Sequence, residues 1–250
     1  MSSLPPLEIV LRALGELDPR GVLPPSSMEL ELCLGLSREE LDEAFQAVYA
    51  HPMEDVLELF AQERLLQCPS QLLEDYTGRV TMEHGYTGEL YYGYFPYGFG
   101  ELLLATTPLG LCYSSFTLGD REEARERLIG SYPHVAHFHE ESHPILEQAM
   151  RHLAEPTVEP LPPLHLIGTL FQRSVWQTML LVPRGSCISY QRIGQALGFP
   201  QAAQAIGSAV GANPLAPFIP CHRVLPKEHT IGFYHWGTGL KAALLAPELL

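Results

Sequence analysis

Apolar side chains in the first 80 residues repeat at the spacing of amphipathic helices, with acidic residues between them. Two groups each fall on one helical face: Leu41, Ala44, Phe45 and Val48, and then Met53, Val56, Leu57 and Phe60. Residues three or four apart share a face of a helix, so this periodicity predicts helices here. We therefore expect residues 1–80 to form an acidic, helical region.

The pattern becomes strand-like between residues 86 and 116. Aromatic and apolar residues dominate 86–95, 101–106 and 110–116, and the Pro- and Gly-containing stretch 96–100 separates the first two. Such runs bounded by turn residues are typical of neighbouring antiparallel strands. We expect a small sheet that begins in this segment.

Two helices are predicted after these strands. Asp120 and Glu123 have capping-box spacing, and Gly130 ends the first helix. The second helix begins after Ser142, and we expect one face of it to carry Ile145, Ala149 and Leu153. Four prolines between residues 156 and 163 then form a stiff linker.

A further helix begins after Thr169, whose hydroxyl can cap it. Its expected inner face carries Phe171, Val175, Trp176 and Met179. The pattern as a whole predicts an α/β (α+β) protein with three regions: a helical region over 1–80, a small α/β domain over 81–156 and a mostly helical domain over 157–250.

Composition narrows the class of protein. The chain of 250 residues is 46% hydrophobic and can bury a substantial core. Five cysteines at irregular spacing, with no CxxC pair, argue against a disulfide framework and favour the cytoplasm. The first residues lack the apolar segment of a signal peptide, and no apolar run reaches membrane-spanning length.

The formal net charge of −14 is distributed unevenly. Residues 165–250 carry six basic and two acidic side chains, whereas the preceding 164 residues carry nine basic and 27 acidic ones. Phosphate binding depends on local positive charge, so the C-terminal region is the better candidate for contact with nucleic acid.

The segment Pro220-Cys221-His222 is the strongest candidate for chemistry. A thiol is a strong nucleophile only as the thiolate, and an adjacent imidazole lowers its pKa. Cysteine is also a common small buried residue, and a Cys-His pair alone is consistent with that structural role. A zinc deaminase requires a second cysteine three residues later, where this chain has Val224.

A series of spaced elements surrounds this segment and occurs in a fixed order. They are Gly168-Thr169-Leu170-Phe171-Gln172, Val175-Trp176, Val182-Pro183-Arg184-Gly185, Ser189-Tyr190, Gly194, Gly198, Pro200, Ala203, Gly207, Ala212-Asn213-Pro214, Pro220-Cys221-His222-Arg223-Val224, Gly232-Phe233-Tyr234-His235-Trp236-Gly237, Lys241 and Glu248. Together they resemble the catalytic domain of O6-alkylguanine-DNA alkyltransferases, and the tail is most similar to the C-terminal part of Ada-type proteins. The resemblance is close over residues 165–250 and looser back to about residue 86.

The resemblance implies a fold and a DNA-binding element. The fold would be a small RNase H-like α/β domain followed by a mostly helical alkyltransferase domain. A helix-turn-helix would span 189–198 and 200–211, with Gly198 ending one helix and Pro200 starting the next. We expect the alanine-rich face of the second helix to pack in the core.

The resemblance also implies a reaction and its residues. Cys221 would take the alkyl group from O6-alkylguanine in double-stranded DNA, with O4-alkylthymine as a second candidate substrate. His222 would act through water as the base, oriented by Glu248, and Tyr190 would donate a hydrogen bond to the leaving guanine. Asn213 would brace the loop that holds the cysteine. No cofactor or metal is implied, and a monomer is expected.

Three further residues are candidates for substrate binding: Tyr234, Trp236 and Arg223. The chain departs from the family at Gln204, where an arginine usually fills the space of the extruded nucleotide. Glutamine can hydrogen-bond to an orphaned base, but it lacks the charge and the planar fork of a guanidinium group. We expect weaker binding to duplex DNA and unchanged chemistry at Cys221.

Two other functions remain open from the sequence. Residues 34–66 resemble the second helix-turn-helix of AraC-type regulators, which would fit a transcriptional regulator, but eight acidic and two basic residues lie there. A lesion-binding protein with weak or no transfer would lack the reactive cysteine. The front region has no zinc-binding cysteine module, since Cys33 and Cys68 cannot supply four thiolates.

Two expectations concern other parts of the chain. The histidines between His134 and His143 are interpreted as a solvated loop, with a metal site as the alternative. A fragment from about residue 81 onward is expected to keep the transfer activity, because the resemblance lies there.

Overall fold

The structure is a computed structural model, and it describes residues 4–61, 64, 65, 67, 72 and 78–250. The chain forms two compact units that alternate along the sequence. The first unit consists of residues 1–72, 182–203 and 222–250, and the second of residues 73–181 and 204–221. One crossing between the units falls at the peptide bond from Cys221 to His222. The predicted boundaries after residues 80 and 156 stay a prediction.

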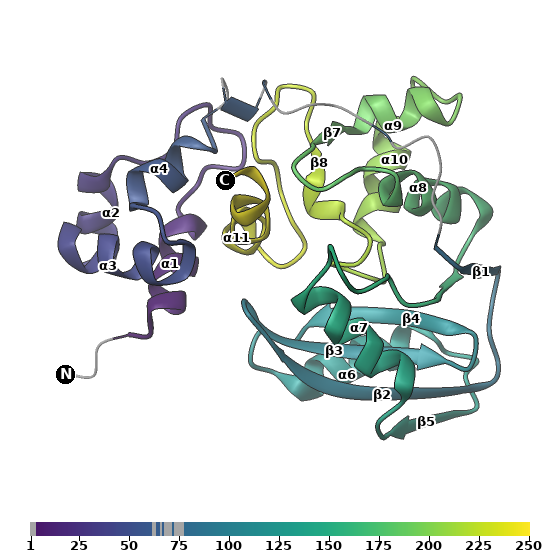
Figure 1. Cartoon of the computed structure of the whole chain (residues 1–250). Coiled ribbons are helices and arrows are strands. Elements are labelled where there is room, and N and C mark those ends of the chain that lie inside the picture. Colours follow the sequence, from purple (N-terminus) through teal and green to yellow (C-terminus); the bar gives the residue numbers. More distant parts are fainter. Residues whose placement is uncertain (1–3, 62–63, 66, 68–71, 73–77) are drawn as a thin grey trace. The chain divides into compact units, whose positions relative to one another are not determined.

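The first unit is mainly helical (Figure 1). Its helices are α1 (Pro6–Gly15), α2 (Ser27–Leu34), α3 (Arg38–Tyr49), α4 (Met53–Glu58), α9 (Tyr190–Ala196) and α11 (Thr238–Leu249). Strands β7 (Ile188–Ser189) and β8 (Val224–Leu225) form a short parallel pair. Helices α2 and α3 begin with capping boxes, which satisfy N–H groups that the first turn of a helix leaves without partners.

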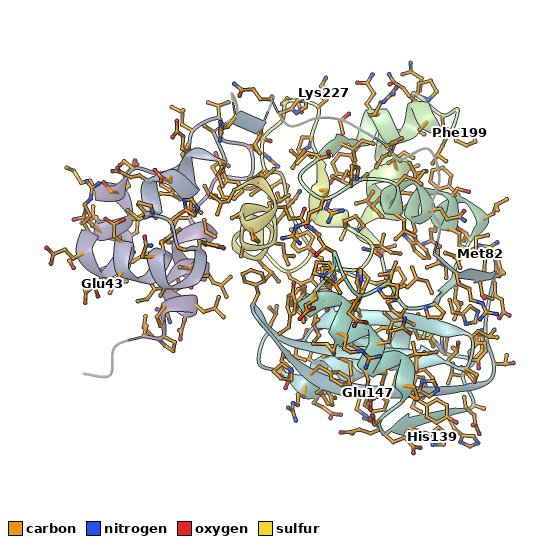
Figure 2. All side chains as sticks on the ribbon, viewed as in Figure 1. Glu43, Met82, His139, Glu147, Phe199 and Lys227 are labelled. Carbon is orange, nitrogen blue, oxygen red and sulfur yellow. The ribbon has the colours of Figure 1, made fainter. Side chains whose placement is uncertain are left out.

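The helical periodicity of the first region is confirmed. On α3, Leu41, Ala44 and Phe45 are buried, while Val48 is half-buried. On α4 and just beyond it, the four predicted apolar residues are all buried. The acidic residues of α3 lie on its outer side, as Glu43 shows (Figure 2). Cys68, one of the two cysteines considered above for a zinc module, lies outside the described residues.

Helix α11 is the centre of the first unit, because residues 239–246 are all buried. A helix with no exposed face packs against other elements all around its axis. Helix α1 packs against it at Gly239, where a Cβ atom would lie 2.6 Å from the carbonyl oxygen of Leu11 and 2.9 Å from the backbone nitrogen of Gly15. Glycine at this position therefore permits the two backbones to approach closely.

Pro247 lies inside α11 and has no N–H group to donate to the carbonyl of Ala243, four residues earlier. Tyr49, the last residue of α3, donates its hydroxyl to that carbonyl at 3.4 Å. Burial raises the pKa of Tyr49, so its hydroxyl stays protonated and remains a donor. Helix α3 thus supplies a hydrogen bond that α11 cannot make for itself.

The second unit contains a six-stranded mixed sheet in the order β1-β6-β4-β3-β2-β5. The strands are β1 (Val80–Glu83), β2 (Glu89–Tyr97), β3 (Gly100–Thr107), β4 (Gly110–Phe116), β5 (His137–Glu140) and β6 (Leu164–Ile167). Strands β2, β3 and β4 are antiparallel neighbours, and the other pairs are parallel. The unit's helices are α6 (Arg121–Ser131), α7 (Pro144–Ala154), α8 (Leu170–Leu180) and α10 (Ala203–Gly211), whose first residue belongs to the first unit.

Helices α6 and α7 cover the two faces of the sheet, with α7 in front and α6 behind (Figure 1). Ala124 and Leu128 of α6 pack with Leu103 and Ala105 of β3 and with other buried residues on that face. The sequence placed Ile145, Ala149 and Leu153 on one face of α7, and the most buried residues of this helix are a different set. Leu146 and Ala149 are the buried pair, whereas Ile145 and Leu153 are half-buried.

The prediction that the histidines between His134 and His143 lie in a loop is partly wrong. Residues 137–140 form β5, which pairs in parallel with β2 at the edge of the sheet. His139 lies at this outer edge (Figure 2), where its ring stacks on Tyr91 with centroids 5.1 Å apart. No group of three or more metal-ligating side chains occurs among the described residues. Strands β1, β5 and β6 are short, and their pattern was too brief to identify.

The mixed α/β class is confirmed, but the structure argues against a self-sufficient fragment from residue 81. Residues 1–72 belong to the same compact unit as α11, and their removal would expose the face of α11 that α1 covers. Exposing that apolar area has a large free-energy cost.

The approach of α1 to α11 gives the first prediction. Gly239→Ala should lower the free energy of unfolding by about 2 kcal/mol, because its methyl group would collide with the backbone of α1. Gly15→Ala is the control: no atom lies within 4 Å of its added Cβ. We expect it to be neutral or to stabilise by up to about 1 kcal/mol. Urea unfolding followed by circular dichroism measures both, and equal stabilities would contradict the close approach.

Candidate active site

The side chain of Asn213 organises the loop that leads to Cys221. Its Nδ2 donates to the carbonyl of Ile219 at 2.8 Å, and its Oδ1 accepts from the backbone nitrogen of Leu215 at 3.0 Å. An asparagine that uses both ends of its amide in this way fixes the backbone on both sides of a turn. The bracing contacts expected of Asn213 are therefore present.

Ser114 of β4 fastens the same loop to the sheet. Its backbone nitrogen donates to the carbonyl of Pro214 at 2.7 Å, and its hydroxyl donates to the carbonyl of Ala216 at 2.6 Å. Sequence reasoning missed this residue. The available signal was a serine within an otherwise buried strand, since a buried hydroxyl needs a hydrogen-bond partner.

Cys221 stands at the end of this braced loop and begins a short 3-10 helix, Cys221–Arg223. Its backbone nitrogen donates to the carbonyl of Ile219 at 2.8 Å, and its side chain is 6% exposed. A thiol this buried has little surface on which to meet a reactant in solution. Cys221 is a thiol rather than part of a disulfide, as are the other described cysteines, Cys33, Cys112 and Cys187.

In the first unit, His222 and Arg223 share one carboxylate, that of Glu248 on α11. The distance from His222 Nε2 to Glu248 Oε1 is 3.3 Å. Arg223 binds both oxygens, with Nε 2.8 Å from Oε2 and Nη2 2.8 Å from Oε1. All three side chains are buried or nearly so. The structure thus brings together the predicted pair His222 and Glu248.

The electrostatics of this group favour a neutral imidazole beside an ionised carboxylate. Burial raises the pKa of Glu248, but hydrogen bonds from His222 and Arg223 outweigh burial and lower it to about 2. Burial also lowers the pKa of His222, more than Glu248 raises it. Because a carboxylate only accepts, a neutral His222 carries its hydrogen on Nε2. Its Nδ1 is then an acceptor, and it has no hydrogen-bond partner among the described residues.

Arg223 has contacts that favour a positioning role over the predicted contact with substrate. Besides Glu248, it donates through Nη1 to the carbonyl of Val182 at 2.6 Å. A guanidinium group that is committed to a bidentate carboxylate and a carbonyl has little capacity left for a ligand. Its role is best described as fixing Glu248 and the segment at Val182.

The predicted aromatic residues of the site lie on the loop between β8 and α11. Tyr234 and Trp236 have ring centroids 5.2 Å apart, and both are half-buried. Behind this loop, the buried Lys241 donates to the carbonyl of Val224 at 2.8 Å.

Tyr190 is half-buried at the start of α9, directly after its capping residue Ser189. The roles predicted for these residues stay predictions.

The predicted helix-turn-helix segments are helical, but the second helix begins later than expected. Helix α9 ends at Ala196, Gly198 has a φ of +80°, and α10 begins at Ala203 rather than at Pro200. The prediction that Pro200 starts the helix was therefore wrong. Proline and the residues that follow it form a longer turn instead.

Helix α10 is held at one end by Trp176 of α8, whose Nε1 donates to the carbonyl of Ala209 at 2.8 Å. Gln204 is exposed on this helix, as are Ala203 and Ala205. The expectation that the alanine face packs in the core holds for Ala209 alone. The exposed face is small and uncharged, so another backbone could approach it closely.

In the part of the chain that the structure describes, no helix is long and apolar enough to cross a membrane.

Comparison with known proteins identifies a matching family and similar sequences. The sequence profile of the family described as "6-O-methylguanine DNA methyltransferase, DNA binding domain" matches residues 170–249. The regulatory protein Ada of Salmonella typhimurium is 36% identical over 155 residues, which cover 60% of this chain and 43% of that protein. The chain thus spans less than half the length of this curated relative.

Solved structures match over a larger share of their own length. A variant of the O6-methylguanine methyltransferase of Mycobacterium tuberculosis is 31% identical, with a TM-score of 0.52, and the match covers 64% of this chain and 93% of that one. The structure of the Mycobacterium tuberculosis protein in complex with DNA is 29% identical, with a TM-score of 0.53, and covers 64% and 92%. The mixed α/β fold agrees with these structures.

The shared carboxylate gives the second prediction. The pKa of Glu248 lies near 2, below its ordinary value of 4.5, so its ionised form stabilises the fold above pH 4.5 and the effect is lost as pH falls toward 2. Glu248→Gln should therefore lower the free energy of unfolding by about 3 kcal/mol at pH 7. At pH 3.5 the difference from wild type should be smaller by about 1.4 kcal/mol.

Glu228→Gln serves as the control for this measurement. Glu228 forms an exposed ion pair with Lys227 at 3.6 Å, so its loss should change stability by less than about 0.5 kcal/mol. A difference between Glu248→Gln and wild type that does not depend on pH would contradict the lowered pKa.

Proposed function

This chain belongs to the O6-methylguanine DNA methyltransferase family, and we propose that the protein repairs alkylated DNA by transferring the alkyl group of O6-alkylguanine to Cys221. The observation that carries the proposal is the braced, enclosed thiol of Cys221, followed directly by a histidine whose Nε2 is engaged by a buried carboxylate. The transfer consumes the protein, because a thioether is not hydrolysed back to a thiol.

The reaction requires a thiolate at Cys221. With its Nε2 hydrogen directed to Glu248, His222 presents the lone pair of Nδ1, which can take the thiol proton through a water molecule. The ionised Glu248 stabilises the positive charge that His222 then acquires. Arg223 keeps Glu248 ionised and in place, so its contribution is indirect.

The transfer itself is a displacement at the alkyl carbon. The sulfur of Cys221 attacks that carbon, the bond from carbon to O6 breaks, and its electrons pass to the guanine. Guanine leaves as its ordinary protonated form after it takes up the proton that the thiol lost. By resemblance, Tyr190 donates a hydrogen bond near guanine N3 and spreads the negative charge that develops on the base. Tyr234 and Trp236 would line the alkyl side.

The substrate is proposed to be double-stranded DNA whose damaged nucleotide has left the stack. The enclosure of Cys221 supports this, because a base inside a duplex cannot reach it. Helix α10 is the candidate groove-facing element, since its exposed residues are uncharged and, apart from Gln204, small. O4-alkylthymine is a second candidate substrate. We propose further that the protein works as a cytoplasmic monomer without a cofactor.

The first region does not support a second function as a DNA-binding regulator. The helix that would read the groove, α3, begins with Arg38, but Glu39, Glu40, Asp42 and Glu43 follow within its first two turns. These carboxylates would repel phosphates. A lesion-binding protein without transfer is disfavoured by the presence of Cys221.

The decisive experiment is mass spectrometry after incubation with duplex DNA that contains O6-methylguanine. We expect one methyl group, on the peptide that contains Cys221. Cys221→Ser should take up none, whereas Cys187→Ser, which changes another buried cysteine, should react as the wild type does. Full transfer by Cys221→Ser would refute the assignment, and binding without any transfer would favour the lesion-binding function.

The departure at Gln204 yields a prediction about DNA affinity. Gln204→Arg should strengthen duplex binding and speed duplex repair, because it adds a positive charge and a stacking plane on the exposed face of α10. The plot of log affinity against log salt should steepen by about 0.9 if the new charge meets one phosphate. Reaction with free O6-benzylguanine should hardly change, since no base must be extruded.

Gln201→Arg is the matched control, because Gln201 is also exposed and precedes α10. It adds the same charge outside the helix. Equal gains in duplex repair from both variants would indicate general attraction to DNA and would refute a specific role for position 204.

A further inference from the structure

The turn at residues 18–21 of the first region is stabilised by two local hydrogen bonds. Asp18 Oδ1 accepts from the backbone nitrogen of Arg20 at 2.9 Å, and its carbonyl accepts from that of Gly21 at 3.0 Å. Pro19 has a fixed φ, which further restricts the backbone. The carbonyl of Pro19 and the side chain of Arg20 are therefore presented in a defined direction by local interactions alone.

This turn contacts the loop that precedes α11. The backbone nitrogen of Gly232 donates to the carbonyl of Pro19 at 2.9 Å. The guanidinium carbon of Arg20 lies 5.2 Å from the centre of the Phe233 ring, within range for a cation–π interaction. Phe233 is 64% exposed, so this contact lies at the protein surface.

Gly232 is constrained from the other side as well. Its φ is +70°, and a Cβ atom there would lie 2.8 Å from the ring of Pro226. Positive φ and crowding together require glycine. The loop is thus held between Pro226 and the turn at Pro19, and the residues that follow this clamped point are Tyr234 and Trp236.

We propose that Pro19 and Arg20 are positioning residues for the substrate loop 231–236, so that the N-terminal helical region sets how the alkyl group is accommodated. This inference rests on the proposed function, in which Tyr234 and Trp236 line the alkyl side. Arg20 acts through Phe233 and the backbone rather than by touching the substrate. A larger alkyl group contacts more of the loop, so its transfer depends more strongly on the loop's position.

The test compares Arg20→Ala with Arg12→Ala and with Arg20→Lys. Arg12 is on α1 and is engaged by Glu8 at 2.6 Å, so its replacement removes the same charge from the same region without touching the loop. Lysine retains a cation above the ring of Phe233. Two quantities are measured: hydrogen exchange of residues 231–236, and the rates of alkyl transfer from free O6-benzylguanine and O6-methylguanine.

We expect Arg20→Ala to speed exchange in the loop and to lower the ratio of benzyl to methyl transfer about two- to fivefold. Arg12→Ala should match the wild type in both, and Arg20→Lys should recover most of the ratio. Unchanged exchange in Arg20→Ala would overturn the clamp, as would equal ratios in Arg20→Ala and Arg12→Ala. If the wild type takes no methyl group from duplex DNA that contains O6-methylguanine, the proposed function fails, while the exchange measurement still decides whether Arg20 holds the loop.

Discussion

The carboxylate of Glu248 accepts hydrogen bonds from His222 and Arg223, and much of the first unit is arranged around this shared interaction. It joins the last turn of α11 to the two residues that follow the candidate nucleophile. Arg223 extends the connection to the carbonyl of Val182, so Arg223 links three separate stretches of chain. An ionised group buried in this way is stable only because each oxygen has a partner.

The position of Glu248 depends in turn on how α11 is packed. The close approach at Gly239 sets the distance to α1, and the hydroxyl of Tyr49 serves the carbonyl that Pro247 leaves without a helical donor. The N-terminal helices are therefore part of the structure that carries the site, although their sequence resembles a separate regulatory module. Their acidic outer faces are compatible with this role, since the contacts with α11 come from α1 and from the buried Tyr49 of α3.

Local sequence signals predicted the elements well and the long-range contacts poorly. The cap at Thr169 and the antiparallel strands each depend on residues close in sequence, and the pattern identified them. The start of α10 depends on packing and was missed. So were the fastening by Ser114, the fork of Arg223 and the contact of α1 with α11, because no spacing rule relates residues that lie so far apart along the chain.

The pairing of α1 with α11 has a consequence for the order in which the chain folds. The two helices stand more than 220 residues apart along the sequence, so α1 lacks its partner until α11 has been synthesised. Contacts of such high sequence separation form late and slow the acquisition of the native state. During synthesis, the apolar face of α1 must either remain exposed or be covered temporarily by another surface. The sheet of the second unit, whose strands all precede residue 168, can form in the meantime.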